Sequence, residues 1–308
     1  MGFGFGQAPF QLAKCEVDTC LTTGNRSLVS LKDYDAIIFH FRATSPKDMP
    51  RSRYYHQRWI FEEIESSAYV FQDPAIYNGL FNWTMTFRRD SDIVNAYGRI
   101  FKVGSPINAT VTRINYAEGK TKMAAWFVSN CYSKSSREKI VRKLQKHFEV
   151  DVFGRCGPYT CPHTKQCYEF LEKNYKFYFS FENSLCKDYV TEKLFQILKY
   201  NIVPVVYGLA DYDLTAPPDS FINVLDYPDL DSLAKYLKYL DSNDTAYSMY
   251  FRWKGFFKIE NGWSNTAQSF CDLCKKLHQD NTPKVYDDIN KWFIIQGNCK
   301  KLKTKGWF

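Results

Sequence analysis

The sequence predicts an α/β protein with two Rossmann-like domains, and three observations support this fold class. Residues 175–208 read as a strand, a polar loop, a short helix and a second strand. Residues 122–153 repeat this strand–helix–strand order. Near Lys120 the chain changes from a loop-rich stretch to these repeats, so we place the domain boundary there.

The first domain, residues 12–120, is expected to contain three strands. Asp35–Phe41 (DAIIFHF) is the first clear strand, and Gln57–Glu65 is a strand of mixed character. Phe81–Asp92 alternates aromatic and polar residues, which predicts a strand that runs into a charged loop. The loop-rich stretch Gly98–Lys120 closes this domain.

The second domain, residues 121–261, begins with a strand at Lys122–Val128. Ser135 and Glu138 have the spacing of a capping box. The helix that follows has apolar residues on one face: Ile140, Val141, Leu144 and Phe148. Val150–Phe153 is the next strand, which completes the first strand–helix–strand unit of this domain.

The second such unit contains the most polar loop of the domain. Its strands are the aromatic run Lys176–Phe181 and the β-branched run Ile202–Tyr207. Ligands of such units bind beyond the carboxyl ends of the strands. This places four polar residues at a binding rim: Asn183, Tyr189, Glu192 and Lys193. The alternative is that Glu192 and Lys193 only solvate the end of a helix.

Three further helices are expected towards the C-terminus. Asp229–Leu240 has leucines at helical spacing, and Tyr247–Phe257 is an aromatic helix whose apolar stripe belongs to the core. Ser269–His278 is a late helix on which Cys271 and Cys274 share one face.

Ten cysteines favour an oxidising compartment with disulfides. The alternative is a zinc site formed by Cys271, Cys274, His278 and Cys299. Sequons agree with a secretory route, and we expect glycans at Asn25, Asn108 and Asn243. A fourth sequon at Asn82 lies in a segment that looks too packed for glycosylation.

The net charge of +8 is spread along the chain, which fits an anionic nucleotide sugar but is not specific for one. The sequence has neither an arginine-rich helix nor an aromatic ribonucleoprotein motif, so we expect no nucleic-acid partner. It also contains no apolar stretch long enough to cross a membrane and no signal peptide. The first ten residues resemble a truncated start.

The segment FSFENSLCKDYVTEK, followed by VPVVYG, resembles the sugar-donor signature of the α-1,3-fucosyltransferases, glycosyltransferase family 10. The resemblance implies the GT-B fold, with two Rossmann-like domains facing a cleft, and GDP-fucose as the donor. By the same resemblance, Glu192 binds the ribose hydroxyls and Lys193 the diphosphate. Asn183 and Tyr189 would line the donor pocket.

A second resemblance selects the catalytic base. Gln57-Arg58-Trp59 through Glu65-Ser66 matches the family pattern QRWxxxxxES. This implies that Glu65, rather than Glu62 or Glu63, is the base, although this chain has Ser67 where the family often has proline. Without the resemblance, a solvated acidic rim is an equally good interpretation of these carboxylates.

Two more segments resemble family blocks. FNWTMTFRRDSDI matches an acceptor-side block, so Trp83, Arg88 and Arg89 are candidate acceptor contacts. For the two arginines, the preferred alternative is that they form an ion-pair cluster with Asp90. WFVSNCYSKSSR, followed by VDVFG, matches a donor-side block. This implies that Arg137 grips the diphosphate, with Ser129 and Asn130 beside it. Otherwise Arg137 is an exposed first-turn residue that opposes the helix dipole.

The resemblance also implies a disulfide framework. Cys271 and Cys274 would be bridged to Cys15 and Cys20, which returns residues 262–308 to the first domain. At least one local bridge is expected within the group Cys156, Cys161 and Cys167, a pattern similar to that of invertebrate members. The third cysteine of that group could pair with Cys131 or Cys186, and the sequence does not assign Cys299.

The implied reaction is inverting transfer of L-fucose from GDP-β-L-fucose to O3 of N-acetylglucosamine, with the innermost Asn-linked residue of N-glycans as the preferred acceptor. The alternatives are an outer-chain (Lewis-type) acceptor and a non-catalytic luminal glycan-binding protein. No cofactor or metal is required, and a divalent cation would be at most accessory. The resemblance implies a location in the Golgi lumen, with the membrane anchor and stem of a type II protein missing from this sequence.

Overall fold

The structure is a computed structural model that describes residues 2–103, 114–162 and 164–301. The chain separates into two compact units. The first contains residues 1–97, 186–188 and 261–299, and the second contains residues 98–185, 189–260 and 300–308. The boundary that we placed at residue 120 therefore falls inside the second unit.

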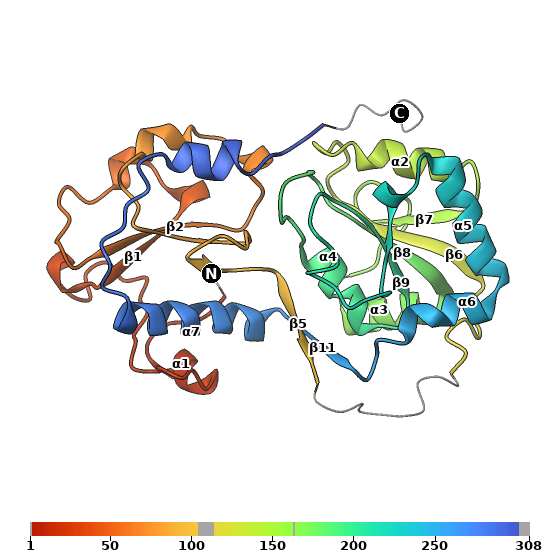
Figure 1. Ribbon diagram of the computed structural model, residues 1–308, viewed down its shortest axis with the longest axis horizontal. Helices are drawn as coiled ribbons and strands as arrows, with labels where there is room; N and C mark the ends of the chain where they lie inside the picture. Colours follow the sequence, from red (N-terminus) through yellow and green to blue (C-terminus); the bar gives the residue numbers. More distant parts are fainter. Residues whose placement is uncertain (1, 104–113, 163, 302–308) are drawn as a thin grey trace. The chain divides into compact units, whose positions relative to one another are not determined.

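The first unit is built on a parallel sheet of four strands in the order β1-β2-β3-β4 (Figure 1). The strands are β1 (Ala36–His40), β2 (Arg58–Glu63), β3 (Trp83–Thr86) and β4 (Ile93–Val94). Because strand β2 pairs on both sides, five of its six residues are buried. The three strands predicted for this region are confirmed, but the predicted segment Phe81–Asp92 contains only the four-residue strand β3, and β4 was not predicted.

Helix α7 (Trp263–Gln279) covers one face of this sheet, together with the short helix α1 (Ala8–Leu12). Phe270 and Leu273 of α7 pack in one core cluster with Ile60 and Met85 of the sheet. Short turns of 3-10 or π-helix complete the unit: Leu31–Asp33, Phe41–Ala43, Pro46–Asp48, Ser67–Tyr69, Pro74–Tyr77 and Lys291–Ile295.

The second unit contains a parallel sheet of five strands in the order β10-β9-β8-β6-β7 (Figure 1). The strands are β6 (Lys122–Phe127), β7 (Val150–Phe153), β8 (Tyr175–Phe181), β9 (Val203–Tyr207) and β10 (Ile222–Asn223). All seven residues of the central strand β8 are buried. Complete burial of a central strand is typical of a parallel sheet that is covered on both faces.

Helices cover both faces of this sheet. They are α2 (Arg137–Leu144), α3 (Lys165–Asn174), α4 (Glu192–Phe195), α5 (Leu230–Ser242) and α6 (Asp244–Ser248). Apolar residues of α2 and α5 share one core cluster with Phe177 and Phe179, whereas Tyr168 and Leu171 of α3 pack on the opposite face. Within the described residues of this unit, 3-10 turns lie at Ile197–Lys199, Val224–Asp226 and Met249–Phe251.

The predicted aromatic helix Tyr247–Phe257 is wrong in its length. Helical structure ends with the turn at Met249–Phe251, and the chain then enters strand β11 (Phe257–Asn261). This strand forms a two-stranded sheet with β5 (Gly98–Lys102), in the stretch that we had expected to be loop. At Gly98 a Cβ atom would lie 2.3 Å from Phe195 of α4, so only glycine fits.

All ten cysteines form disulfides. Cys15 is bonded to Cys271 and Cys20 to Cys274, which is the pairing that the resemblance implied. The other three bridges are Cys131–Cys156, Cys161–Cys167 and Cys186–Cys299. The alternative zinc site is therefore wrong, because its three thiols are consumed in disulfides.

Among the described residues, no helix combines the length and the apolar character that a membrane span requires.

Candidate active site

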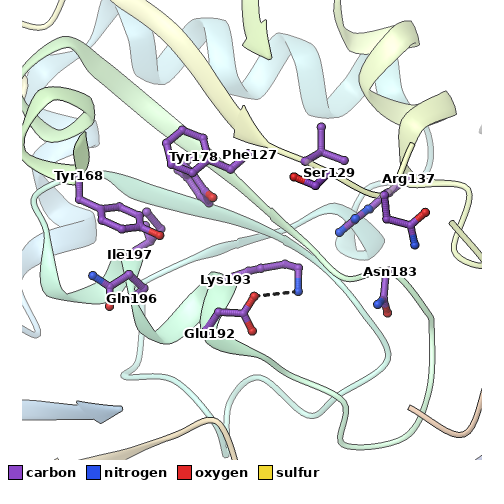
Figure 2. Close-up of a pocket in the computed structure, with 12 residues that line it drawn as sticks. Phe127, Ser129, Arg137, Tyr168, Tyr178, Asn183, Glu192, Lys193, Gln196 and Ile197 are labelled. Carbon is purple, nitrogen blue, oxygen red and sulfur yellow. Dashed lines mark hydrogen bonds and ion pairs between the residues drawn. The ribbon is translucent and has the colours of Figure 1, made fainter. Parts of the chain in front are cut away.

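A cavity of about 250 Å³ lies in the second unit, where strands β6 and β8 end and helix α4 begins (Figure 2). The carboxyl ends of parallel strands are the expected ligand-binding edge of such a sheet. The cavity is lined by Phe127, Val128, Ser129, Asn130, Arg137, Tyr168, Tyr178, Asn183, Glu192, Lys193, Gln196 and Ile197. These include six of the seven residues that the sequence assigned to the sugar donor.

The charged part of the cavity is centred on Lys193. Its Nζ lies 2.7 Å from Thr191 Oγ1, 3.3 Å from Glu182 Oε2 and 3.3 Å from Glu192 Oε1. Burial would lower the pKa of Lys193, but the charges of Glu182 and Glu192 outweigh it and raise that pKa. Lys193 is therefore a cation at neutral pH.

Arg137 is the second cation of the cavity, and it is 3% exposed. Its guanidinium donates to the carbonyl oxygen of Phe181 and lies 5.7 Å from the centre of the Trp126 ring. The interpretation of Arg137 as an exposed first-turn residue is therefore wrong. Because the strand end and the ring hold the group rigidly, Arg137 can present its charge to a ligand without first losing side-chain freedom.

The segment before α2 is not capped as the sequence predicted. Ser136 occupies the N-cap position with a φ of +56° and forms no side-chain cap bond. Ser135 instead donates its hydroxyl to the carbonyl oxygen of Glu182 at 2.7 Å. Glu138 accepts a hydrogen bond from Ser133 Oγ at 2.9 Å. The predicted capping box is therefore wrong, because Ser135 joins this loop to the end of β8 rather than to its own helix.

The other part of the cavity is aromatic, with Phe127, Tyr168 and Tyr178 beside Gln196 and Ile197 (Figure 2). Phe127 packs on Tyr168 and Tyr178, with ring centres 5.8 and 5.6 Å apart. Burial raises the pKa of Tyr168 to about 12, so its phenol stays protonated and can donate a hydrogen bond. A flat, partly polar ligand group fits such a surface.

A disulfide and a close backbone contact hold the loop Ser129–Asn130 against the segment that follows β7. The Cys131–Cys156 disulfide ties it to the segment that follows β7. Gly154 in that segment has a φ of +97°, and a Cβ atom there would lie 2.7 Å from the carbonyl oxygen of Val128. The family-like VDVxG pattern therefore needs its glycine for this close approach.

Three carboxylates of the first unit lie at or just after the end of β2. Glu62 is buried and accepts a hydrogen bond from His40 Nδ1 at 2.6 Å. Glu63 is fully buried; its Oε1 accepts the backbone N–H of Glu65, and burial raises its pKa. Glu65 is partly exposed, with Oε2 3.8 Å from Arg42 Nη1. Of the three, only Glu65 is open to an incoming hydroxyl.

Comparisons with known proteins show the family of this chain. Residues 117–292 match the family described as "Glycosyltransferase family 10 (fucosyltransferase) C-term", and residues 3–98 match "Fucosyltransferase, N-terminal". The chain belongs to glycosyltransferase family 10. Its relatives include Glycoprotein 3-alpha-L-fucosyltransferase A of Drosophila melanogaster, with 36% identity over 98% of this chain and 59% of the relative.

A second family 10 relative, Alpha-(1,3)-fucosyltransferase C of Drosophila melanogaster, is 35% identical over 94% of this chain and 72% of its own length. The chain thus spans between about three fifths and three quarters of these two relatives. A solved structure of an α1,3-fucosyltransferase with GDP-fucose superimposes with a TM-score of 0.51 and 19% identity, covering 82% of this chain and 80% of that one. This likeness confirms the GT-B fold.

Two site residues that the family resemblance suggested are buried in this structure. Tyr189 is 1% exposed and is not among the residues that line the cavity, so its place in the donor pocket stays a prediction. Trp83 is fully buried between Arg58 and Lys276, whose charged groups lie 5.2 and 4.9 Å from the centre of its ring. A buried side chain in this position cannot touch an acceptor.

Arg88 is also a structural residue rather than an acceptor contact. It is 1% exposed, is bonded to Asp90 at 2.9 and 2.6 Å, and donates to the carbonyl oxygen of Trp292. This is the ion-pair cluster that the sequence analysis preferred. Arg89 is exposed, and its backbone N–H donates to Asp188, so its side chain remains an acceptor-side candidate.

The sequons differ in accessibility. Asn25 is exposed, whereas Asn243 is half-buried and its side chain caps α6. Asn82 is 8% exposed and hydrogen-bonded to Trp59 and Lys284, in agreement with the expectation that it carries no glycan. Asn108 lies outside the described residues.

Sequence reasoning missed the aromatic part of the cavity. Tyr178 and Phe127 belong to strands that the sequence did predict, but a buried strand pattern does not reveal which aromatic ring ends in a cavity. Tyr168 comes from α3, which was hidden by the cysteine-rich segment before it. Residues Gln196 and Ile197 follow the polar motif directly, and helical spacing from Glu192 and Lys193 could have found them.

Metal ligands are scarce in the part of the chain that the structure describes. The one close cluster of His, Cys, Asp or Glu side chains there is Cys20, Cys274 and His278. Its two sulfur atoms form a disulfide with each other, so it offers no thiolate to a metal.

Proposed function

We propose that this protein is an inverting α-1,3-fucosyltransferase that moves L-fucose from GDP-β-L-fucose to O3 of an N-acetylglucosamine residue. The observation that carries the proposal is the cavity at the carboxyl ends of β6 and β8. It combines two held cations, Arg137 and Lys193, with the exposed carboxylate of Glu192 and an aromatic wall. Family membership and these groups point to the same nucleoside diphosphate sugar.

The charged groups suit the two polar parts of this donor. Lys193 and Arg137 would bind the diphosphate and offset the charge that grows on GDP as it leaves. The Glu192 carboxylate can accept hydrogen bonds from two ribose hydroxyls. Ser129, Asn130 and Asn183 add polar groups to the same cavity. No covalent intermediate is needed, because inversion requires a single displacement at C1.

The base is assigned to Glu65. Its carboxylate would accept the O3 proton of the acceptor while the oxygen attacks C1 of fucose. Assistance of this kind contributes about 10²–10⁴-fold to the rate. Partial exposure of Glu65 supports this role over Glu62 and Glu63, whose carboxylates are buried and hydrogen-bonded within the unit.

The preferred acceptor is the innermost N-acetylglucosamine of N-glycans. A relative named glycoprotein 3-alpha-L-fucosyltransferase and the invertebrate-like cysteine pattern support this choice. The alternative is an outer-chain acceptor, as other relatives are named only as α-(1,3)-fucosyltransferases. A glycan-binding protein without activity is disfavoured, because such a protein has no use for Glu65, Arg137, Glu192 and Lys193 together.

The compartment that we propose is the Golgi lumen. Five disulfides support an oxidising compartment. We expect no metal or cofactor requirement for the transfer, and neither nucleic acid nor a membrane surface as a direct partner.

The test is an incubation with GDP-fucose and two acceptors, a biantennary glycopeptide with exposed N-acetylglucosamine termini and N-acetyllactosamine. Mass spectrometry with glycosidase fragmentation locates the added deoxyhexose. We expect fucose on the innermost N-acetylglucosamine, its loss in Glu65→Gln, and its retention in Glu16→Gln, which changes an exposed surface carboxylate. Transfer only to lactosamine would refute the core acceptor, and no transfer to either would refute the proposed activity on these glycans.

A further inference from the structure

Glu182 is a buried acid at the end of β8 for which the proposed reaction has no role. It is 1% exposed. Its backbone N–H donates to the carbonyl oxygen of Tyr207 at 3.0 Å, and its own carbonyl accepts Ser135 Oγ at 2.7 Å. The backbone is thus fixed at the edge of the sheet where the cavity lies. A buried carboxylate is costly unless it is well bonded, so its partners indicate its function.

Those partners are two residues of the loop and helix that follow. Glu182 Oε1 accepts the backbone N–H of Thr191 at 2.8 Å, and both of its oxygens lie 3.0 Å from Thr191 Oγ1. Glu182 Oε2 lies 3.3 Å from Lys193 Nζ. Because the Thr191 hydroxyl donates to Glu182, it can accept from Lys193 at 2.7 Å. Glu182 therefore holds the lysine directly and through Thr191.

The Lys193 ammonium has three protons and, in this structure, three acceptors: Thr191, Glu182 and Glu192. A phosphate oxygen must therefore replace one of them. The two carboxylates differ in how easily they can leave. The Glu182 side chain is 1% exposed, whereas the Glu192 side chain, which lines the cavity beside Lys193 (Figure 2), is 59% exposed. Breaking a buried ion pair leaves a charge without a counter-ion inside the protein, whereas an exposed carboxylate is readily solvated by water.

We propose that Glu182 is a positioning residue, the permanent counter-ion that aims Lys193 at the diphosphate, and that Glu192 is an exchangeable counter-ion which the diphosphate displaces. This inference rests on the proposed binding of GDP-fucose. One hydrogen bond of Lys193 passes from Glu192 to a phosphate oxygen, and no covalent bond changes. The released Glu192 carboxylate is then free to accept the ribose hydroxyls, so both parts of the donor are bound in one step.

The charges around Lys193 give this arrangement a pH signature. Glu182 and Glu192 raise the pKa of Lys193, while burial and the Arg137 charge lower it. Tyr212, a further titratable group that the Glu182 charge affects, stays neutral because burial and that charge raise its pKa far above the usual range. Without the Glu182 charge, burial and the Arg137 charge would still lower the pKa of Lys193, and only Glu192 would raise it. Lys193 would then lose its proton at lower pH.

The first experiment measures GDP affinity by calorimetry and the pH dependence of kcat/KM for GDP-fucose in Glu182→Gln. We expect GDP affinity to fall about 10–100-fold, as for other positioning partners. The alkaline limb of the pH profile should move to lower pH, with the acceptor KM unchanged. An unmoved alkaline limb would mean that Glu182 only supports the loop, and would overturn the proposal.

The matched control is Asp151→Asn. Asp151 is also buried in this sheet and paired with a lysine, at 2.5 Å from Lys122 Nζ, but it lies at the edge where strands β6 and β8 begin. The control should reduce stability without moving the alkaline limb. If Glu182→Gln does not fold, Thr191→Val tests the same link, because it removes only the bridging hydroxyl. It should weaken GDP binding about 3–10-fold, and unchanged binding would overturn the proposal.

The exchange of counter-ions predicts that two variants change the affinity for inorganic pyrophosphate in opposite directions. Pyrophosphate is a suitable probe because it has no ribose. Pyrophosphate should bind more tightly to Glu192→Gln, because the competing carboxylate is gone, and more weakly to Glu182→Gln. A weaker or unchanged affinity in Glu192→Gln would refute the exchange. Failure of the wild-type protein to bind GDP would instead refute the proposed function, so the two failures are distinguishable.

Discussion

Neighbouring carboxylates of strand β2 point to opposite faces, as the pleat requires. Glu62 meets His40 of the adjacent strand β1, whereas Glu63 accepts the N–H of Glu65. Both are buried, and both have partners within the first unit. The sequence could not distinguish these acids from Glu65 without the family pattern, because three acids within four positions carry no information about burial.

The His40–Glu62 pair predicts a pH-dependent contribution to stability. The hydrogen bond to Glu62 raises the pKa of His40, although burial opposes it. Stabilisation by protonated His40 is therefore complete below the unfolded pKa of about 6.5 and is lost as the pH rises through the folded pKa. His40→Gln should lower the free energy of unfolding by about 1 kcal/mol or less at pH 5.5, since the ring is partly solvated.

The same substitution should cost less at pH 8.5, and urea unfolding at the two pH values measures the difference. His278→Gln is the control, because His278 is exposed and its Nε2 lies 3.1 Å from the hydroxyl of Thr19 rather than beside a carboxylate. An equal loss at both pH values in His40→Gln would contradict the assigned pair.

Arg88 gives a prediction that separates stability from acceptor binding. Arg88→Lys cannot reproduce two parallel bonds to Asp90 together with the bond to the Trp292 carbonyl. We expect a loss of about 2 kcal/mol in unfolding free energy and an unchanged acceptor KM. A raised acceptor KM with normal stability would restore Arg88 as an acceptor contact. Arg89→Lys, at an exposed position, should leave stability unchanged.

At the scale of elements, sequence reasoning found the longer strands of both sheets, but it did not find the two-residue edge strand β4 (Ile93–Val94), because so short a run carries no periodicity. It missed α3, because Pro162 and the two cysteines Cys161 and Cys167 made the segment look like a disulfide-bonded loop rather than the start of a helix at Lys165. It also misjudged the start of α2. There Ser135 fits a cap by spacing, but the structure uses its hydroxyl on the end of β8. Tertiary contacts determine where these two helices begin, and the spacing of residues along the sequence carries no information about such contacts.

The loop between β6 and α2 depends on the Cys131–Cys156 bridge. In the chain-entropy account, a bridge of this span stabilises by about 3 kcal/mol. The double variant Cys131→Ser, Cys156→Ser should therefore lose stability. It should also bind GDP several-fold more weakly, because Ser129 and Asn130 are no longer held.

Calorimetry with GDP and thermal unfolding test both effects. The control is Cys20→Ser, Cys274→Ser, which removes a bridge of the first unit and should reduce stability alone. Equal GDP affinity in wild type and the Cys131/Cys156 variant would show that the bridge does not shape the cavity.

At the scale of the whole chain, two parallel bridges hold α7 to the N-terminal segment. Cys15–Cys271 and Cys20–Cys274 each span more than 250 positions, with separations of 256 and 254. Once one bridge has formed, the other closes only a short ring. Loss of either alone should cost about 2–3 kcal/mol, and loss of both about 3 kcal/mol more than the sum of the single losses.

Denaturant unfolding of the two single-bridge variants and of the double-bridge variant measures this non-additivity. Alanine replacements at each pair of cysteines keep the comparison matched. Strictly additive losses would show that the two bridges act on separate loops, contrary to their positions on one helix. Such a result would also weaken the inference that the C-terminal helix is an integral part of the first unit.

The central claim is that the cavity of the second unit binds the nucleoside diphosphate through Lys193. The most direct test is the dissociation constant of GDP for the wild-type protein, Lys193→Ala and Lys235→Ala. Lys235 is an exposed lysine on α5 and serves as the matched control. We predict about 100-fold weaker binding for Lys193→Ala and wild-type binding for Lys235→Ala. Equal GDP affinity in all three proteins would contradict the account.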